Sequence, residues 1–223
     1  MNKINTRELR NVQRKIAKEV RTSDELKKEE IKKIAGFDTA FSGDKIICAA
    51  VVYDISTGQV IEKKHTITKS PMPYIPGYRA FREGPAIMQT YYSLETEPEI
   101  MMIQGHGVSH PLKCGLASYV GAELGKATIG VAKKILVGEV KDGKLVILNE
   151  TRGEEVITKE HAKPLYVSAG NFVSLKTAVD LVRKYTVDPH KMPEPLHFAH
   201  KYAKEILEEM KAKTNKITTP SAA

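Results

Sequence analysis

The spacing of apolar positions in the first twenty residues predicts an amphipathic helix. Leu9, Val12, Ile16 and Val20 recur at steps of three and four, which places them on one helical face. The pattern then changes to that of strands. Residues 46–55 are apolar almost throughout, as in a strand buried on both faces, and residues 59–68 alternate. A strand is also expected at residues 31–37, ending at Asp38.

Helices and short strands alternate in the rest of the chain. We expect helices at residues 81–93, 112–124, 173–185 and 196–211, and strands at 99–104, 127–131, 145–148 and 165–168. This order predicts an α/β fold with a mixed central sheet, an antiparallel meander followed by parallel strands, flanked by helices. We expect a single domain over residues 1–213 and a frayed, disordered tail over 214–223. The functional edge of such a sheet lies at the carboxyl ends of its parallel strands, where Asp38 and Gln104 fall.

Composition narrows the class of protein. Of 223 residues, 41% are hydrophobic and 28% charged, as in ordinary globular proteins. No apolar run approaches the roughly 18 residues of a spanning helix, and residues 1–20 carry no signal-peptide core, so we expect a cytoplasmic protein without a membrane partner. The net charge of +8 favours polyanionic partners, although the lack of Trp argues against a broad base-stacking platform. Cys48 and Cys114 have neither disulfide-framework nor zinc spacing and are interpreted as buried small residues.

Two segments carry candidate chemistry near the middle of the chain. Asp38 follows a strand and is able to hold a metal, although a turn-capping role is favoured for this residue taken alone. Prolines and glycines bracket Tyr74, Arg82 and Glu83 in the segment from Ser70 to Pro85. Such a stiffened loop can hold an aromatic wedge against a duplex, and an ordinary surface loop with a packed tyrosine is equally compatible.

Histidines and lysines mark the remaining candidates. His106 and His110 have HxxxH spacing, but zinc binding would require a helix, and glycines and a proline make this segment a loop. Such a loop is better suited to present backbone N–H groups and imidazoles to a phosphate. Lys133 can pair with a phosphate or lie in solvent. His197 and His200 share a helical face, near a metal or simply in packing contacts.

Taken together, these segments resemble the endonuclease V family, whose members nick strands beside deaminated bases such as inosine. The matching stretches are GFDTAFSGD, PYIPGYRAFREGP, QGHGVSHPLKCGLASYVG, ATIGVAKKILVG, YVSAGNFVSLKTAVDLV and MPEPLHFAH, in family order over nearly the whole domain. The resemblance implies an RNase H-like fold. It also implies Mg²⁺-dependent hydrolysis, with Mn²⁺ as a possible substitute, at the second phosphodiester bond 3′ to the lesion.

The resemblance also assigns roles by position. Asp38 matches the first metal-binding aspartate, Glu83 the catalytic glutamate and Tyr74 the wedge tyrosine. His110 and Lys133 match site residues near the scissile phosphate, and His200 matches a position close to the metal. The residues expected to contact nucleic acid are Tyr74, Pro76, Gly77, Arg82, Gly105, His106 and Gly107.

Two positions depart from the family pattern. The family has an aspartate where this chain has Gln104, giving QGHG in place of DGHG. An amide can coordinate Mg²⁺ but brings no charge, and its stem is one methylene longer. Asn171 stands where the family usually has the first of a basic pair. Both changes are expected to reduce the number of charged side chains in the site.

Three hypotheses follow from this combination. The first, which is favoured because the other site residues are retained, is a monomeric Mg²⁺-dependent DNA-repair endonuclease acting on inosine-containing DNA and possibly RNA. The second is a binding protein that keeps the lesion pocket and the wedge but cuts slowly or not at all. The third is that Gln104 was introduced to trap a complex. Gln104 is the residue that separates the first two.

Overall fold

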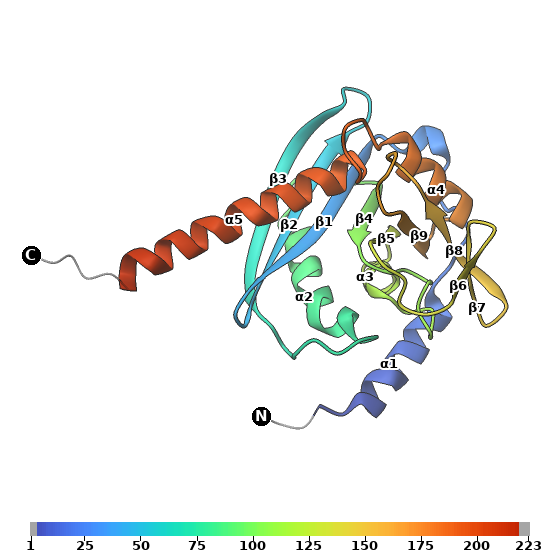
Figure 1. The fold of residues 1–223 in the computed structure, drawn as a ribbon, viewed down its shortest axis with the longest axis horizontal. Helices are drawn as coiled ribbons and strands as arrows, with labels where there is room; N and C mark the ends of the chain where they lie inside the picture. Colours follow the sequence, from blue (N-terminus) through green and yellow to red (C-terminus); the bar gives the residue numbers. More distant parts are fainter. Residues whose placement is uncertain (1–3, 219–223) are drawn as a thin grey trace, which may run out of the picture.

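A mixed sheet forms the centre of the computed structural model, which describes the backbone of residues 4–218 and the side chains of residues 4–213 (Figure 1). Its nine strands have the order β3-β2-β1-β4-β5-β9-β8-β7-β6. The strands are β1 (Lys33–Ser42), β2 (Lys45–Asp54), β3 (Gln59–Lys69), β4 (Ile100–Gln104), β5 (Ala127–Ala132), β6 (Glu139–Lys141), β7 (Lys144–Ile147), β8 (Glu150–Val156) and β9 (Leu165–Asn171).

The strand directions confirm the predicted mixed sheet. β1, β2 and β3 form the antiparallel meander, and β1, β4 and β5 are parallel. The strands after β5 were predicted incompletely. β9 joins β5 in the antiparallel direction, and β8, β7 and β6 extend the sheet as further antiparallel strands. β6 and β8 escaped the sequence pattern because both are rich in charged residues.

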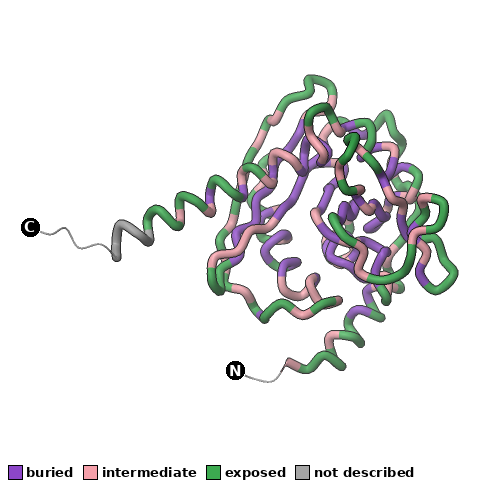
Figure 2. Tube along the Cα trace, in the orientation of Figure 1, coloured by how far each residue is buried: buried purple, intermediate pink, exposed green. Residues whose placement is uncertain are grey.

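Helices cover both faces of this sheet. The helices are α1 (Thr6–Glu19), the short 3-10 helix η1 (Lys28–Glu30), α2 (Arg79–Tyr92), α3 (Leu116–Leu124), α4 (Leu175–Lys184) and α5 (Glu194–Thr218). α2 and α3 share one hydrophobic core with β1, β2 and β4, whereas α4 and the start of α5 share another with β4, β5 and β9. Figure 2 shows the buried residues concentrated in the strands between these two layers.

A glycine in β1 determines how α5 crosses the sheet. A Cβ atom on Gly36 would lie 2.0 Å from the carbonyl oxygen of Pro195, so only glycine permits this contact. The close approach brings the first turns of α5 directly over β1. Beyond these turns the helix extends away from the body of the protein (Figure 1).

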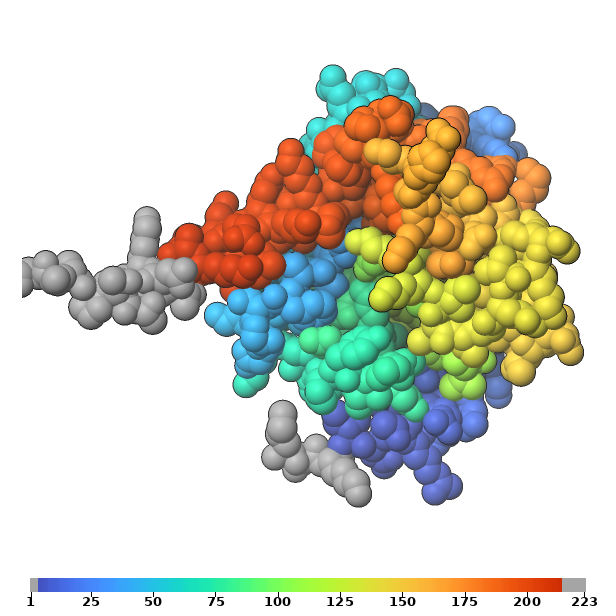
Figure 3. Space-filling model, in the orientation of Figure 1, coloured from blue at the N-terminus to red at the C-terminus, as the bar shows by residue number. Residues whose placement is uncertain are grey.

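The N-terminal helix supports the loop that precedes α2. Gln13, which is buried in α1, donates from Nε2 to the carbonyl oxygen of Gly77 at 2.7 Å. Figure 3 shows α1, in blue, against the teal segment that contains this loop and the start of α2. The helix predicted from the apolar spacing is therefore present, and it serves to position a loop far along the chain.

Two elements end at residues other than those predicted. β1 does not end at Asp38 as predicted but runs to Ser42, because its pairing with β2 continues to that residue. Its parallel pairing with β4 stops at Phe37↔Ile103, so Asp38 still lies at the carboxyl edge of the parallel strands, beside Gln104. The predicted tail over 214–223 is helical in α5 through Thr218, and residues 219–223 lie outside the described part of the chain.

No helix within residues 4–218 combines the length and the apolar character needed to cross a membrane.

Candidate nucleic-acid site

The carboxyl edge of β1 and β4 carries two hydrogen-bonded groups of polar side chains. In the first, Asp38 accepts from His200 Nδ1 through Oδ2 at 2.6 Å and from the backbone N–H of Thr39 through Oδ1 at 2.8 Å. Asp38 is only 5% exposed. His200 reaches it because α5 crosses β1 in direct contact at Gly36. The predicted proximity of Asp38 and His200 is thus present in the structure.

The second group is organised around Arg79, which the sequence analysis did not single out. Its guanidinium donates from Nε and Nη2 to the two carboxylate oxygens of Glu83, each at 2.7 Å. Nη2 also donates to Gln104 Oε1 at 3.0 Å. The two charged residues are four positions apart in α2, a spacing that places them on one helical face and that could have revealed the pair from the sequence.

Thr39 links the two groups and was also missed by the sequence analysis. Successive residues of a strand point to opposite faces, so Asp38 is directed toward α5 while Thr39 is directed toward α2. The hydroxyl of Thr39 donates to Glu83 Oε2 at 2.7 Å. Glu83 is 1% exposed, and three donated hydrogen bonds compensate the burial of its charge.

Charge strengthens the Arg79 pair. Burial by itself lowers the pKa of Arg79, but the hydrogen bonds and charge of Glu83 more than offset this, so the pKa of Arg79 lies above its ordinary value. The guanidinium is therefore a permanent cation in the space between Glu83 and Gln104. A bidentate guanidinium–carboxylate pair of this kind is a strong, directional interaction.

The side chains do not fit the divalent metal that the family resemblance implied. Every carboxylate oxygen of Asp38 and Glu83, and the amide oxygen of Gln104, already accepts a hydrogen bond from the protein. Mg²⁺ prefers several oxygen ligands of high negative charge, whereas here a guanidinium stands among them. Among the side chains that the structure describes, no group of three or more His, Cys, Asp or Glu residues is arranged to hold a metal ion.

A pocket of about 320 Å³ opens beside Arg79 and Gln104. Its walls come from the loop before α2, the loop after β4 and the end of β5. The lining includes Tyr74, Gly77, His106, His110 and Lys133. The volume lies within the range of pockets that take small organic groups. Three of the seven predicted nucleic-acid contacts, Tyr74, Gly77 and His106, therefore line one cavity.

The loop before α2 is rigidly held. The Gly77 carbonyl oxygen accepts from Gln13 Nε2 and from His110 Nε2, the latter at 2.9 Å. Gly77 has φ +82°, which disfavours any other residue at this turn. Arg82 stacks its guanidinium over the ring of Phe41 at 4.1 Å and lies 5.8 Å from the ring centre of Tyr74. Arg82 thus packs near Tyr74, the predicted wedge residue.

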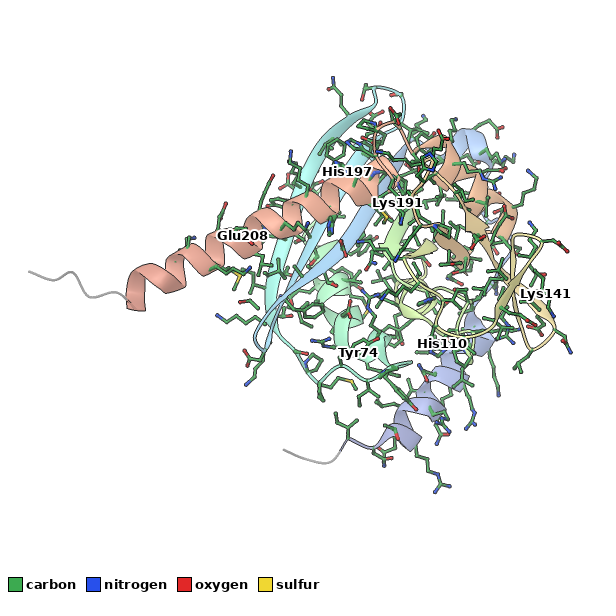
Figure 4. The ribbon with its side chains drawn as sticks, in the orientation of Figure 1. Tyr74, His110, Lys141, Lys191, His197 and Glu208 are labelled. Atoms are coloured by element: carbon green, nitrogen blue, oxygen red, sulfur yellow. The ribbon has the colours of Figure 1, made fainter. Side chains whose placement is uncertain are left out.

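Tyr74 itself is 57% exposed at the edge of the pocket. Figure 4 shows the Tyr74 and His110 side chains on the same side of the molecule, below the sheet in this view. Pro76 lies between Tyr74 and Gly77 in the chain and restricts the backbone there. The contacts of these loop residues with nucleic acid stay a prediction.

The two histidines of the loop after β4 are held by the protein itself. The Leu112 N–H donates to His110 Nδ1, so Nε2 carries the proton and donates to Gly77. Burial, followed by the charge of Arg152, lowers the pKa of His110. His106 contacts the Lys134 carbonyl oxygen through Nε2 at 2.9 Å, and burial lowers the pKa of His106 to about 4. Both rings are therefore neutral near pH 7.

The amides of this loop do not present a phosphate cradle as predicted. The N–H groups of Gly105, Gly107 and Val108 donate to Val131, Ser168 and Ala169, because the loop is packed tightly onto β5 and β9. A Cβ on Gly107 would lie 1.9 Å from the carbonyl oxygen of Ala169. The loop therefore has a structural role. The buried Arg152 stabilises it by donating to the carbonyl oxygens of His110 and Pro111.

Lys133 is exposed and lines the pocket at the end of β5. Lys191 lies close enough to Lys133 to interact with it electrostatically. Burial, followed by the nearby charges of Lys133 and Lys163, lowers the pKa of Lys191. Lys191 and His197 lie together near the start of α5 in Figure 4. The pocket therefore has a positively charged border, suited to a phosphodiester backbone.

Asn171 does not belong to this site, contrary to the expectation from the sequence. It pairs with Thr128 near the start of β5, whereas Gln104 pairs with Val131 near the end of that strand. Its side chain is buried, accepts from the Arg21 N–H and donates to the carbonyl oxygens of Gly121 and Lys126. Asn171 therefore ties α1, α3 and β9 together and does not change the polarity of the pocket.

Comparisons with known proteins agree with the fold. The sequence profile of the endonuclease V family matches residues 14–201. The chain is 41% identical over 199 residues to the endonuclease V of Thermofilum pendens, covering 87% of this chain and 85% of that protein.

Solved structures show the same relationship. The endonuclease V of Streptomyces avermitilis superposes with a TM-score of 0.86 at 28% identity, covering 94% of this chain and 96% of that one. The Ciona intestinalis endonuclease V, in complex with a DNA containing an inosine followed by a ribo-adenosine, gives a TM-score of 0.84 at 26% identity and covers 92% and 98%. This chain has an RNase H-like fold and belongs to the endonuclease V family.

Proposed function

We propose that this protein binds nucleic acid containing deaminated bases such as inosine and does not use a divalent metal to nick it. The observation that carries this proposal is the engagement of Glu83 and Gln104 by Arg79, beside an open pocket. The pocket and the wedge loop remain as recognition elements. Of the residues that the family would use for a metal, Glu83 and Gln104 are engaged by a guanidinium, and Asp38 is engaged by His200 and Thr39.

The recognition part of the proposal rests on the pocket and its border. A deaminated base turned out of the helix would enter the cavity beside His106, while Tyr74 would fill the gap left in the stack. Turning out a mismatched base costs less than turning out a paired one, which favours lesions over intact duplex. The loop that holds Tyr74 is fixed by Gln13 and His110, so little conformational freedom is lost on binding.

The charge distribution supports binding to a phosphodiester backbone. Lys133 and Lys191 stand near the pocket, and the chain carries a net charge of +8. Because these contacts would be electrostatic, affinity should fall steeply as the salt concentration rises.

The alternative is the Mg²⁺-dependent endonuclease that nicks DNA, possibly RNA, at the second phosphodiester bond 3′ to the lesion. The observation in its favour is membership of the endonuclease V family. It would require Asp38, Glu83 and Gln104 to release their present hydrogen-bond partners and to accept a dication beside Arg79.

The test is fluorescence anisotropy with a duplex containing one inosine and the matched undamaged duplex, combined with strand nicking in Mg²⁺ or Mn²⁺. We expect tighter binding to the inosine duplex and no nicking. Tyr74→Ala should weaken the preference for inosine by about tenfold, as expected for loss of about 1.4 kcal/mol of stacking. Tyr92→Ala, which removes another exposed tyrosine at the far end of α2, serves as the matched control.

The outcomes separate the candidate functions. Equal affinity for both duplexes would refute lesion recognition. Nicking by the unaltered protein that disappears in Asp38→Ala would establish the metal-dependent enzyme instead. The same assays with an inosine-containing RNA strand decide between the two kinds of nucleic acid.

A further inference from the structure

The guanidinium of Arg79 has donors that the protein leaves unused. It carries five N–H donors, of which the contacts to Glu83 and Gln104 engage Nε and both protons of Nη2. Among the described side chains, Nη1 makes no hydrogen bond. The side chain of Arg79 is 28% exposed, and it lines the pocket. Two fixed donors are therefore available to a ligand in that cavity.

The position of Nη1 is defined on both sides. It lies 3.4 Å from the point where a Cβ of Gly105 would stand, so a side chain there would crowd it. Glu83 holds the other edge of the guanidinium with two parallel hydrogen bonds, and Glu83 is itself fixed by Thr39. The free edge is thus preorganised, with its rotamer set by buried partners.

Few other polar groups near the pocket are free to bind an anion. The imidazoles of His106 and His110 are neutral near pH 7 and bonded to backbone carbonyl groups, and the Gly105 and Gly107 amides donate within the protein. Lys133 and Lys134 remain, on flexible and exposed side chains at the border. Arg79 is consequently the one rigid cation among the residues that line the cavity.

The charge of Glu83 is balanced without a metal. Arg79 neutralises it, position 104 carries an uncharged amide, and Asp38 is hydrogen-bonded to His200. In this arrangement no carboxylate at position 104 competes with a ligand for the guanidinium of Arg79. A carboxylate at position 104 would draw the guanidinium away from an incoming anion.

We propose that Arg79 is a built-in cation that takes the place of a divalent metal and binds a phosphodiester oxygen of the nucleic acid through Nη1. The proposal rests on the proposed function, because it names the group that holds the backbone once a base enters the pocket. Planar guanidinium groups match the geometry of phosphate oxygens, and phosphate contacts position a nucleic acid without reading its sequence. Binding at this site is then independent of divalent metal.

The first experiment measures the affinity of the full chain for the inosine duplex and the undamaged duplex, with Mg²⁺ and with a chelator. We expect the same affinity in both conditions. Arg79→Met should weaken binding to both duplexes by about tenfold and reduce the slope of log affinity against log salt by about one. Lys176→Met, which removes an exposed charge on α4 that does not line the pocket, should leave affinity nearly unchanged.

A second variant guards against a folding defect, because Arg79→Met leaves Glu83 buried without its cation. Arg79→Met combined with Glu83→Gln removes both charges and should show the same loss of affinity with a native thermal transition. Arg79→Lys keeps the charge but lacks the planar fork, so it should recover only part of the affinity.

Manganese binding, followed by the electron paramagnetic resonance signal of free Mn²⁺, gives a readout independent of nucleic acid. The unaltered protein should show no saturable Mn²⁺ site, whereas Arg79→Leu combined with Gln104→Asp should show one. Loss of duplex binding in the chelator, unchanged affinity in Arg79→Met, or a saturable Mn²⁺ site in the unaltered protein would each overturn the proposal. Failure of the proposed function is distinguishable, since it appears as equal affinity for inosine and undamaged duplex in every protein and condition.

Discussion

Restoring a carboxylate at position 104 is expected to be insufficient to restore metal-dependent nicking. In Gln104→Asp the new carboxylate would lie within reach of Arg79, which already donates to the side chain at this position. The guanidinium would neutralise the added charge. Only the double variant, Gln104→Asp with Arg79→Leu, frees two carboxylates and removes the competing cation.

The magnitude follows from the geometry. A dication about 2.1 Å from a Glu83 oxygen would share that oxygen with a guanidinium nitrogen 2.7 Å away. The two cations would then lie roughly 4 to 5 Å apart, which costs about 7 kcal/mol at an effective dielectric constant of about 20. If solvent at the partly exposed guanidinium doubles the screening, about 3.5 kcal/mol remains. Arg79 therefore weakens metal affinity by roughly three to five orders of magnitude, at about 1.4 kcal/mol per tenfold change.

The assay is nicking of an inosine-containing oligonucleotide over a series of Mg²⁺ and Mn²⁺ concentrations. We expect no nicking by the unaltered protein or by Gln104→Asp, and metal-dependent nicking by the double variant that is lost when Asp38→Ala is added. Thermal unfolding of each variant checks that the buried Glu83 is tolerated. Full activity of Gln104→Asp with Arg79 in place would refute the reasoning, because it would show that the guanidinium yields to a metal at little cost.

Three further predictions concern the scaffold. Because burial lowers the pKa of His106 from 6.5 to about 4, the unfolded chain binds more protons between these values. The free energy of unfolding therefore has its full contribution from His106 above pH 6.5, and it falls by up to about 3 kcal/mol as the pH drops toward 4. Measured by urea unfolding, this free energy should depend less on pH in His106→Gln. The exposed His161→Gln should keep the pH dependence of the unaltered protein. Gly36→Ala should lower the free energy of unfolding in urea by about 3 kcal/mol or more, because α5 must move off β1. The control Gly43→Ala should lower it by about 1 kcal/mol, because only the positive φ disfavours alanine there. Asn171→Ala should lower the unfolding free energy by about 2 to 3 kcal/mol through lost buried hydrogen bonds, and an unchanged inosine affinity by anisotropy would confirm its place outside the site.

The sequence by itself determined the class of fold. Apolar periodicity located the meander of β1 to β3 and the helices on either side, because helix and strand periods differ and leave distinct traces. It missed β6 and β8, whose charged side chains hide the alternation of a strand that lies at or near the sheet edge. The sequence also identified Gln104 as the unusual residue of the site, since one side chain standing where a carboxylate is expected is visible without any structure.

Only the tertiary structure decided what surrounds that residue. Asp38, Glu83 and Gln104 come from three separate elements. Strand register places them near one another, and the crossing of α5 over Gly36 brings His200 to Asp38. The sequence does not distinguish Arg79 from other basic residues, because its role in the site depends on a hydrogen bond to Gln104, 25 positions along the chain. The structure likewise places Asn171 beside the start of β5, outside the pocket. Local pattern fixes which face a side chain occupies, whereas packing between distant segments decides which charge it meets.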